Sequence, residues 1–224
     1  MFFWDPTFIL LLPAIILAIW AQSRVKNAYA GWSEIRTERN ITGADTARKI
    51  LMQNGLDIRI QKITGTLTDH YDPRSRTLRL SEGVYDNSSV AAVGIAAHEC
   101  GHAIQHSKAY APLTVRNIIF PVVSIGSSLA IPIFFVGLIF SLPILLKLGV
   151  YLFGGVVAFH LITLPVEFDA SRRALKILRE MSILSPEEIT GAKEVLNAAA
   201  LTYVASALMA IMNFLRLLLL SRRR

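Results

Sequence analysis

Two histidines and a glutamate in the segment His98-Glu-Cys-Gly-His102 have the types and spacing needed to bind a metal ion. On a helix, residues four apart differ by about 40° around the axis and about 6 Å along it, so both imidazoles can reach one ion. Zinc takes imidazole ligands at about 2.0 to 2.1 Å, and a catalytic site keeps one position for water. Glu99 flanks this face, where its carboxylate can accept a proton from the attacking water and deliver it to the leaving amine. The segment predicts zinc-dependent peptide hydrolysis; the alternative is an ordinary helix with two hydrogen-bonded histidines.

The third zinc ligand has to come from another segment, because His106 lies about 12 Å along the helix axis from His98. His106 is better explained as a polar residue at the helix end. A carboxylate is available at Glu167, which follows Pro165, a residue typical of a helix's first turn. Two apolar stretches precede this segment and return the chain to the membrane face that carries the histidines. We therefore predict that His98, His102 and Glu167 bind one Zn²⁺ ion per chain.

Further polar residues are candidates for supporting roles. Asp169 could orient a zinc-binding histidine through a hydrogen bond, and ordinary charge at a helix N-terminus is the alternative. His70 and Tyr203 could stabilise negative charge in the transition state, although a turn and anchoring at the membrane interface explain them more simply. Cys100 points away from the metal-binding face and is assigned to the core. As the single cysteine, it excludes an intramolecular disulfide and a multi-cysteine zinc site.

The composition indicates a membrane protein. Of the 224 residues, 53% are hydrophobic and only 17% are charged, and the mean hydropathy is +0.48. Crossing about 30 Å of hydrocarbon as a helix takes roughly 20 apolar residues. Stretches that approach this length occupy residues 2–21, 118–140, 148–164 and 198–220. Basic residues that flank these stretches explain the net charge of +7, and we expect no nucleic-acid partner.

The apolar stretches divide the chain into five segments. Residues 1–21 are predicted to form an N-terminal transmembrane anchor, 22–117 an α+β catalytic segment with the zinc-binding helix, and 118–164 a transmembrane hairpin. Residues 165–197 are a helical segment that supplies the third metal ligand. Residues 198–224 form a helix with a basic tail that either spans the membrane or lies in its interface. The predicted fold class is a mainly α membrane protein with about four transmembrane helices and a small α+β zincin-like catalytic unit.

Within the catalytic segment, the patterns predict helices and strands in alternation. Residues 42–55 begin at a capping threonine and end at a glycine, as a short helix does. Residues 58–63 and 77–81 alternate apolar and polar side chains like half-buried strands, with a turn between them. A second helix is predicted over residues 89–106. We also interpret 77–81 as an edge strand, to which an extended substrate could add by backbone hydrogen bonds.

These motifs resemble those of the YugP family of membrane zinc metallopeptidases, and more distantly those of the HtpX and CAAX prenyl protease group. The resemblance is carried by His98-Glu-Cys-Gly-His102 between apolar anchors, by the two-span hairpin and by Glu167-Phe-Asp-Ala-Ser-Arg-Arg173. It implies a gluzincin-like protease in a bacterial membrane. In the HtpX-like group the third ligand is a glutamate followed four residues later by an aspartate. Here Ser171 occupies that later position and the acid is Asp169.

The leading hypothesis is a membrane-embedded zinc endopeptidase that cleaves membrane or membrane-associated proteins, with Glu99 activating the water. The alternative is a non-catalytic membrane scaffold or chaperone with a structural metal. An intramembrane-cleaving protease fits less well, because the histidines lie outside any apolar stretch of about 20 residues. Basic residues concentrate in 21–117 and 165–197, so the catalytic side is predicted to face the cytoplasm in a multi-pass protein of a bacterial cytoplasmic membrane. The basic tail opposes this orientation if the last helix spans.

Overall fold

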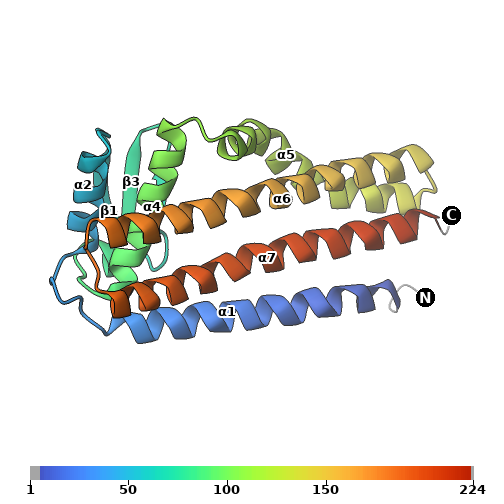
Figure 1. Cartoon of the computed structure of the whole chain (residues 1–224). Coiled ribbons are helices and arrows are strands. Elements are labelled where there is room, and N and C mark those ends of the chain that lie inside the picture. The colour runs from blue at the N-terminus through green and yellow to red at the C-terminus, as the bar shows by residue number, and fades with distance from the viewer. Residues whose placement is uncertain (1–5, 223–224) are drawn as a thin grey trace. The chain divides into compact units, whose positions relative to one another are not determined.

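The computed structural model describes residues 6–222, which form long helices and one small sheet (Figure 1). In chain order the elements are a 3-10 helix η1 (Pro6–Leu11), α1 (Leu12–Ser33), α2 (Gly43–Gln53), β1 (Arg59–Ile63), β2 (His70–Asp72), β3 (Thr77–Ser81), α3 (Glu82–Tyr85), α4 (Val90–Ser107), α5 (Ala111–Ile139), α6 (Pro143–Glu180) and α7 (Pro186–Arg222). Within residues 6–222, four stretches of helix are long and apolar enough to cross a membrane, namely Pro6–Ser33, Ala111–Ile139, Pro143–Glu180 and Pro186–Arg222. The predicted fold class is therefore confirmed.

The chain forms two compact units. The helical unit consists of Met1–Ala21, Thr114–Pro165 and Leu201–Arg224, and the α+β unit consists of Gln22–Leu113 and Val166–Ala200. Helices α1, α5, α6 and α7 each contribute residues to both units. The last part of α6, from Val166, and the first part of α7 therefore belong to the same unit as the sheet, although they are far from it in the sequence.

Helix α6 runs through Pro165, which we expected in the first turn of a separate helix. Proline lacks the N–H that would bond to a carbonyl four residues earlier, but its fixed φ is compatible with a helix. The loss of one hydrogen bond is tolerated in long, packed helices whose neighbours satisfy the freed group. Glu167 consequently lies within a continuous helix, so its position follows from the course of α6 and not from a loop.

In the helical unit, a glycine allows α5 and α6 to approach closely. A Cβ atom at Gly149 of α6 would lie 2.7 Å from the Cβ of Phe134 and 2.9 Å from the carbonyl oxygen of Ala130.

The same unit holds Arg216 of α7 by contacts with Phe8 and Thr7. The guanidinium of Arg216 lies 3.8 Å from the ring centre of Phe8, and its Nε donates to the hydroxyl of Thr7. These contacts stabilise the one charge that interrupts the apolar stretch 198–220.

The sheet has the strand order β1-β3-β2, with β1 parallel and β2 antiparallel to β3. The interpretation of 77–81 as an edge strand is therefore wrong, because β3 is the central strand and pairs on both sides. Its Leu78 and Leu80 are fully buried. The error arose from β2, which has only three residues and so shows no alternation in the sequence. The free edges of this sheet belong to β1 and β2.

A tight turn connects β2 to β3. The Asp72 carboxylate accepts hydrogen bonds from the Ser75 hydroxyl at 2.7 Å and from the Arg74 backbone N–H at 2.9 Å. The hydrogen bond from Ser75, reinforced by that from Arg74 and by the Arg79 guanidinium, lowers the pKa of Asp72 to about 2. The turn thus brings β2 back antiparallel to β3 and places β2 at the edge of the sheet.

The two helices predicted in this unit are confirmed, together with their N-terminal caps. The Thr42 side chain accepts a hydrogen bond from the Asp45 backbone N–H at the start of α2, and Ser89 accepts one from Ala92 at the start of α4. Helix α4 is buried along most of its length, and Figure 1 shows it beside β3. The core of the α+β unit therefore surrounds the helix that carries both histidines.

Candidate metal centre

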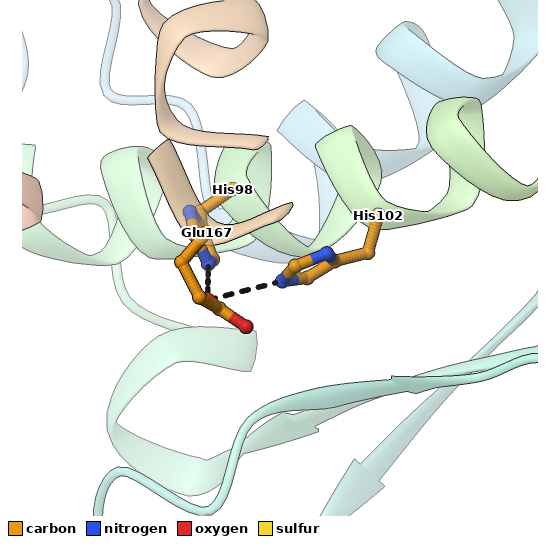
Figure 2. A group of neighbouring side chains, drawn as sticks. All are labelled: His98, His102 and Glu167. Atoms are coloured by element: carbon orange, nitrogen blue, oxygen red, sulfur yellow. Dashed lines mark ion pairs between the residues drawn. The ribbon is translucent and has the colours of Figure 1, made fainter. Parts of the chain in front are cut away.

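The structure brings His98 and His102 of α4 together with Glu167 of α6, all three within the α+β unit (Figure 2). The Nε2 atoms of His98 and His102 lie 3.4 and 3.5 Å from the same oxygen, Oε2 of Glu167. The two imidazole rings meet edge to face, with centres 4.8 Å apart. One potential ligand atom from each residue lies within 4.8 Å of the others. The three side chains thus converge on one point, as the sequence predicted.

This donor set fits a zinc ion. In a tetrahedral site with metal-to-ligand distances of about 2.0 to 2.1 Å, neighbouring ligand atoms are about 3.3 Å apart. The two nitrogen-to-oxygen distances of 3.4 and 3.5 Å are close to that value. Two imidazoles and one carboxylate leave a fourth position for water or substrate, which is the composition of a catalytic zinc site.

Burial favours a cation at this place. The side chain of Glu167 is 5% exposed, whereas those of His98 and His102 are 14% and 13% exposed. A buried carboxylate requires a compensating positive charge or several hydrogen-bond donors. Burial alone would lower the pKa of His102, but the Glu167 carboxylate, 3.5 Å from its Nε2, and the negative charge of Glu99 raise it above the usual histidine value. A group of side chains that attracts a proton in this way also attracts a divalent cation.

Glu99 lies on α4 next to His98 and is 8% exposed. Among the residues described by the structure, its carboxylate forms no hydrogen bond or ion pair. A nearly buried carboxylate that is not engaged by the protein remains available to bind water beside the metal ligands. This is the property required of the base that the sequence assigned to Glu99.

The close approach of α6 to α4 depends on Gly101. A Cβ atom at this position would lie 2.6 Å from the carbonyl oxygen of Ala170 and 3.1 Å from its Cα. These are backbone atoms, which cannot move aside as the end of a flexible side chain can. Gly101 stands between His98 and His102 on α4, and Ala170 is three residues after Glu167 on α6. The glycine therefore sets the separation between the histidines and the carboxylate.

We expect Gly101→Ala to weaken zinc binding and to lower the free energy of unfolding by about 1 to 3 kcal/mol, because overpacking at a helix contact forces the backbones apart. Gly31→Ala is the matched control, since Gly31 is also helical and a Cβ there would meet nothing within 4 Å. The control should be neutral or slightly stabilising, as alanine favours helices. Thermal unfolding in detergent and competition for zinc with a chelating dye measure both effects. Equal zinc affinities of the two variants would contradict this role of Gly101.

Hydrogen bonds to the outer nitrogen of each histidine come from residues that the sequence reading did not single out as partners. The Nδ1 of His98 lies 3.1 Å from the Ser171 hydroxyl, and the Nδ1 of His102 lies 3.0 Å from Oε1 of Gln105. Ser171 occupies the position where the HtpX-like group has an aspartate. Gln105 could have been noticed, because it lies three residues after His102 on the same face of α4. Asp169, expected to orient a histidine, accepts a hydrogen bond from Gln105 instead.

Two other candidates lie on elements other than α4 and α6. The His70 imidazole in β2 has its Nδ1 2.8 Å from the Thr68 carbonyl oxygen and its Nε2 3.3 Å from the Arg79 guanidinium. It is not among the residues whose ligand atoms converge with those of His98 and His102. Tyr203 lies in α7 and belongs to the helical unit. A role of either side chain in transition-state stabilisation stays a prediction.

The two residues that the sequence set aside have other environments. His106 has its Nδ1 2.9 Å from the Tyr71 hydroxyl, which links the end of α4 to β2. Cys100 is fully buried, and its thiol is directed at the Ala47 carbonyl oxygen of α2. Burial raises the pKa of the Cys100 thiol well above its usual range, so it stays protonated. The assignment of Cys100 to the core is confirmed.

Comparison with known proteins agrees with this geometry. A family model described as "Putative neutral zinc metallopeptidase" matches residues 7–222. The chain is 45% identical over 212 residues to the "Putative membrane protease YugP" of Bacillus subtilis (strain 168), and the match covers 94% of both chains. No solved structure matches the chain. With nearly its whole length matched, this membrane protein belongs to the family described as "Putative neutral zinc metallopeptidase".

Proposed function

We propose that the protein is a zinc-dependent endopeptidase whose metal ligands are His98, His102 and Glu167. The convergence of both Nε2 atoms on Glu167 Oε2 carries this proposal, because that arrangement has the chemistry and spacing of a three-ligand zinc site. Membership of a zinc metallopeptidase family supports it independently. The same ligand set, two histidines of one helix and a glutamate of another, supports a gluzincin-like site.

The residues of this chain divide the chemistry among them. Zinc held at this place would supply a Lewis acid that polarises the peptide carbonyl and makes water more acidic. Glu99 accepts the proton of the attacking water and later delivers it to the leaving amine, so that the proton balance is restored in each cycle. Ser171 and Gln105 hold the rings of His98 and His102, respectively. Burial of Glu167 keeps water away from its side of the site.

Membrane or membrane-associated proteins are the proposed substrates. Glu167 lies on α6, and the same helix contains an apolar stretch long enough to cross a membrane. The position of the carboxylate is thereby tied to a membrane helix. The relative from Bacillus subtilis is named a membrane protease, which agrees with this substrate class.

The protein purified in detergent is expected to contain about one zinc ion per chain and to hydrolyse a fluorescent protein substrate. Removal of zinc with 1,10-phenanthroline should abolish hydrolysis, and added zinc should restore it, because the metal supplies the electrophile. Zinc content is measured by atomic emission beside each assay. Stoichiometric zinc without hydrolysis would favour a membrane scaffold or chaperone with a structural metal. Hydrolysis that persists in the absence of zinc would overturn the proposal.

We further propose that the α+β unit faces the cytoplasm of a bacterial cell, since basic residues concentrate in its segments. In this orientation Gln53→Cys on the exposed side of α2 should react with an impermeant maleimide only from the cytoplasmic side. Leu142→Cys, in the turn between α5 and α6, should react only from the opposite side. The buried Cys100 contributes little background. Labelling of Gln53→Cys from outside intact cells would reverse the orientation.

A further inference from the structure

The fully buried side chain of Gln105 connects His102 with the part of α6 that carries Glu167. Its Oε1 lies 3.0 Å from His102 Nδ1. Its Nε2 donates to the Val166 carbonyl oxygen and to Oδ2 of Asp169, both at 2.8 Å. All three polar contacts of this amide lie inside the α+β unit. A single side chain therefore touches one histidine ligand and the residue preceding the carboxylate ligand.

These contacts determine which way the Gln105 amide points. The Val166 carbonyl and the ionised Asp169 carboxylate can only accept hydrogen bonds, so the amide NH₂ must face them. The opposite orientation would place Oε1 against two oxygens and leave Nε2 facing the ring of His102. Arg173 in turn donates to the same Asp169 oxygen and keeps that carboxylate in place. The orientation of the amide is consequently fixed from the α6 side.

The fixed amide determines the tautomer of His102. An amide oxygen only accepts, so Nδ1 of His102 must carry the hydrogen of this bond. In the neutral ring, the form that binds a metal, Nε2 then keeps its lone pair, and Nε2 is the atom 3.5 Å from Glu167 Oε2. His98 differs, because its Nδ1 partner is the Ser171 hydroxyl, which can donate or accept. Of His98 and His102, it is His102 whose tautomer is imposed by its neighbour.

We propose that Gln105 is a positioning residue that holds His102 in the tautomer and orientation that bind metal, and that Asp169 acts on the metal centre through Gln105. The inference rests on the proposed function, since it takes the cluster of His98, His102 and Glu167 to be a zinc site. The role expected of Asp169, orienting a zinc-binding histidine, is thus exerted indirectly: Asp169 holds Gln105, and Gln105 holds His102. Outer hydrogen-bond partners of this kind are worth about ten- to a hundredfold in metal affinity.

Gln105→Met tests the first part, because methionine has a similar length and volume but no amide. We expect its zinc dissociation constant, measured by competition with a chelating dye, to rise about ten- to a hundredfold. The visible spectrum of the Co²⁺-loaded protein should also change, since it reports the geometry of the ligands. Cys100→Ala is the matched control: it truncates a buried side chain of the same helix whose thiol faces α2. The proposal would be overturned if Gln105→Met had the same zinc affinity and the same Co²⁺ spectrum as Cys100→Ala.

Asp169→Ala tests the second part and leaves the buried amide in place. It should weaken zinc binding on its own, but should add less than about a factor of two when combined with Gln105→Met, because residues acting through one contact are not additive. Independent, multiplicative losses would show that Asp169 does not act through Gln105. If Gln105→Met fails to fold, Asp169→Ala alone still tests the proposal. A zinc affinity of Asp169→Ala equal to that of Cys100→Ala would contradict it.

Zinc binding by the unmodified protein distinguishes failure of the proposed metal site from failure of the positioning role of Gln105. Zinc bound by the unmodified protein and lost in His98→Ala supports the metal site whatever the result for Gln105. Normal zinc affinity in Gln105→Met would then refute only the positioning role. An unmodified protein that binds neither Zn²⁺ nor Co²⁺ would refute the metal site and this inference together.

Discussion

Replacing Glu99 by glutamine is expected to lower kcat by about two to four orders of magnitude while zinc remains bound. Glutamine has nearly the same shape, but its amide cannot accept a proton from water at neutral pH. General acid–base catalysis by a positioned carboxylate typically contributes this factor of about 10² to 10⁴. Glu99 is not one of the three side chains whose ligand atoms converge, so the metal affinity should be nearly unchanged. Hydrolysis of a fluorescent protein and the zinc content of the same preparation measure both expectations.

A matched control is Glu82→Gln, which removes a carboxylate of the same unit from the exposed first residue of α3. It should retain both zinc and activity. The assignment of Glu99 as the base fails if Glu99→Gln keeps full activity. It also fails if the variant loses its zinc together with its activity, because Glu99 would then support metal binding and not proton transfer.

Replacing Glu167 by alanine is expected to weaken zinc binding by about two to three orders of magnitude. Zinc sites with four protein ligands contribute about 10 to 16 kcal/mol, so one ligand corresponds to roughly 2.5 to 4 kcal/mol, and each 1.4 kcal/mol is tenfold. Hydrolysis should be lost at low free zinc and only partly recovered at high zinc. Competition with a chelating dye gives the dissociation constant, and activity as a function of free zinc gives the recovery.

Glu180→Ala is the control for this experiment, because Glu180 lies on the same helix and its ion pair with Lys176, at 3.7 Å, is exposed. Such pairs are worth little, so zinc affinity and stability should stay within experimental error of the unmodified protein. A Glu167→Ala variant that binds zinc as tightly as Glu180→Ala would show that the third ligand is another residue.

Local patterns in the sequence were sufficient for the elements whose limits are set locally. The caps Thr42 and Ser89 located the starts of α2 and α4, and the four-residue spacing placed both histidines on one face of α4. The apolar stretches indicated which helices are long enough to span a membrane. Glu167 followed from connectivity, since two apolar spans return the chain to the face from which they left.

Features set by contacts between distant segments were missed or misread. Strand β2 is too short to show a period, so β3 was taken for an edge strand although it pairs with both β1 and β2. The pattern at Pro165 is compatible with a helix start, and only the packing of α6 reveals a continuous helix. Spacing places Gln105 on the same face of α4 as His102, but its role also depends on Val166 and Asp169, which are more than 60 positions away in the sequence.

X-ray absorption at the zinc edge of the purified, active protein would identify the ligand atoms of the zinc ion directly. We predict two imidazole nitrogens at about 2.0 to 2.1 Å and a carboxylate oxygen at about 2.0 to 2.2 Å from the zinc, with one further light-atom ligand from solvent. The spectrum of Glu167→Ala should lose the protein oxygen and keep both imidazoles. A sulfur at about 2.3 Å, or fewer than two imidazoles in the unmodified protein, would contradict the site formed by His98, His102 and Glu167.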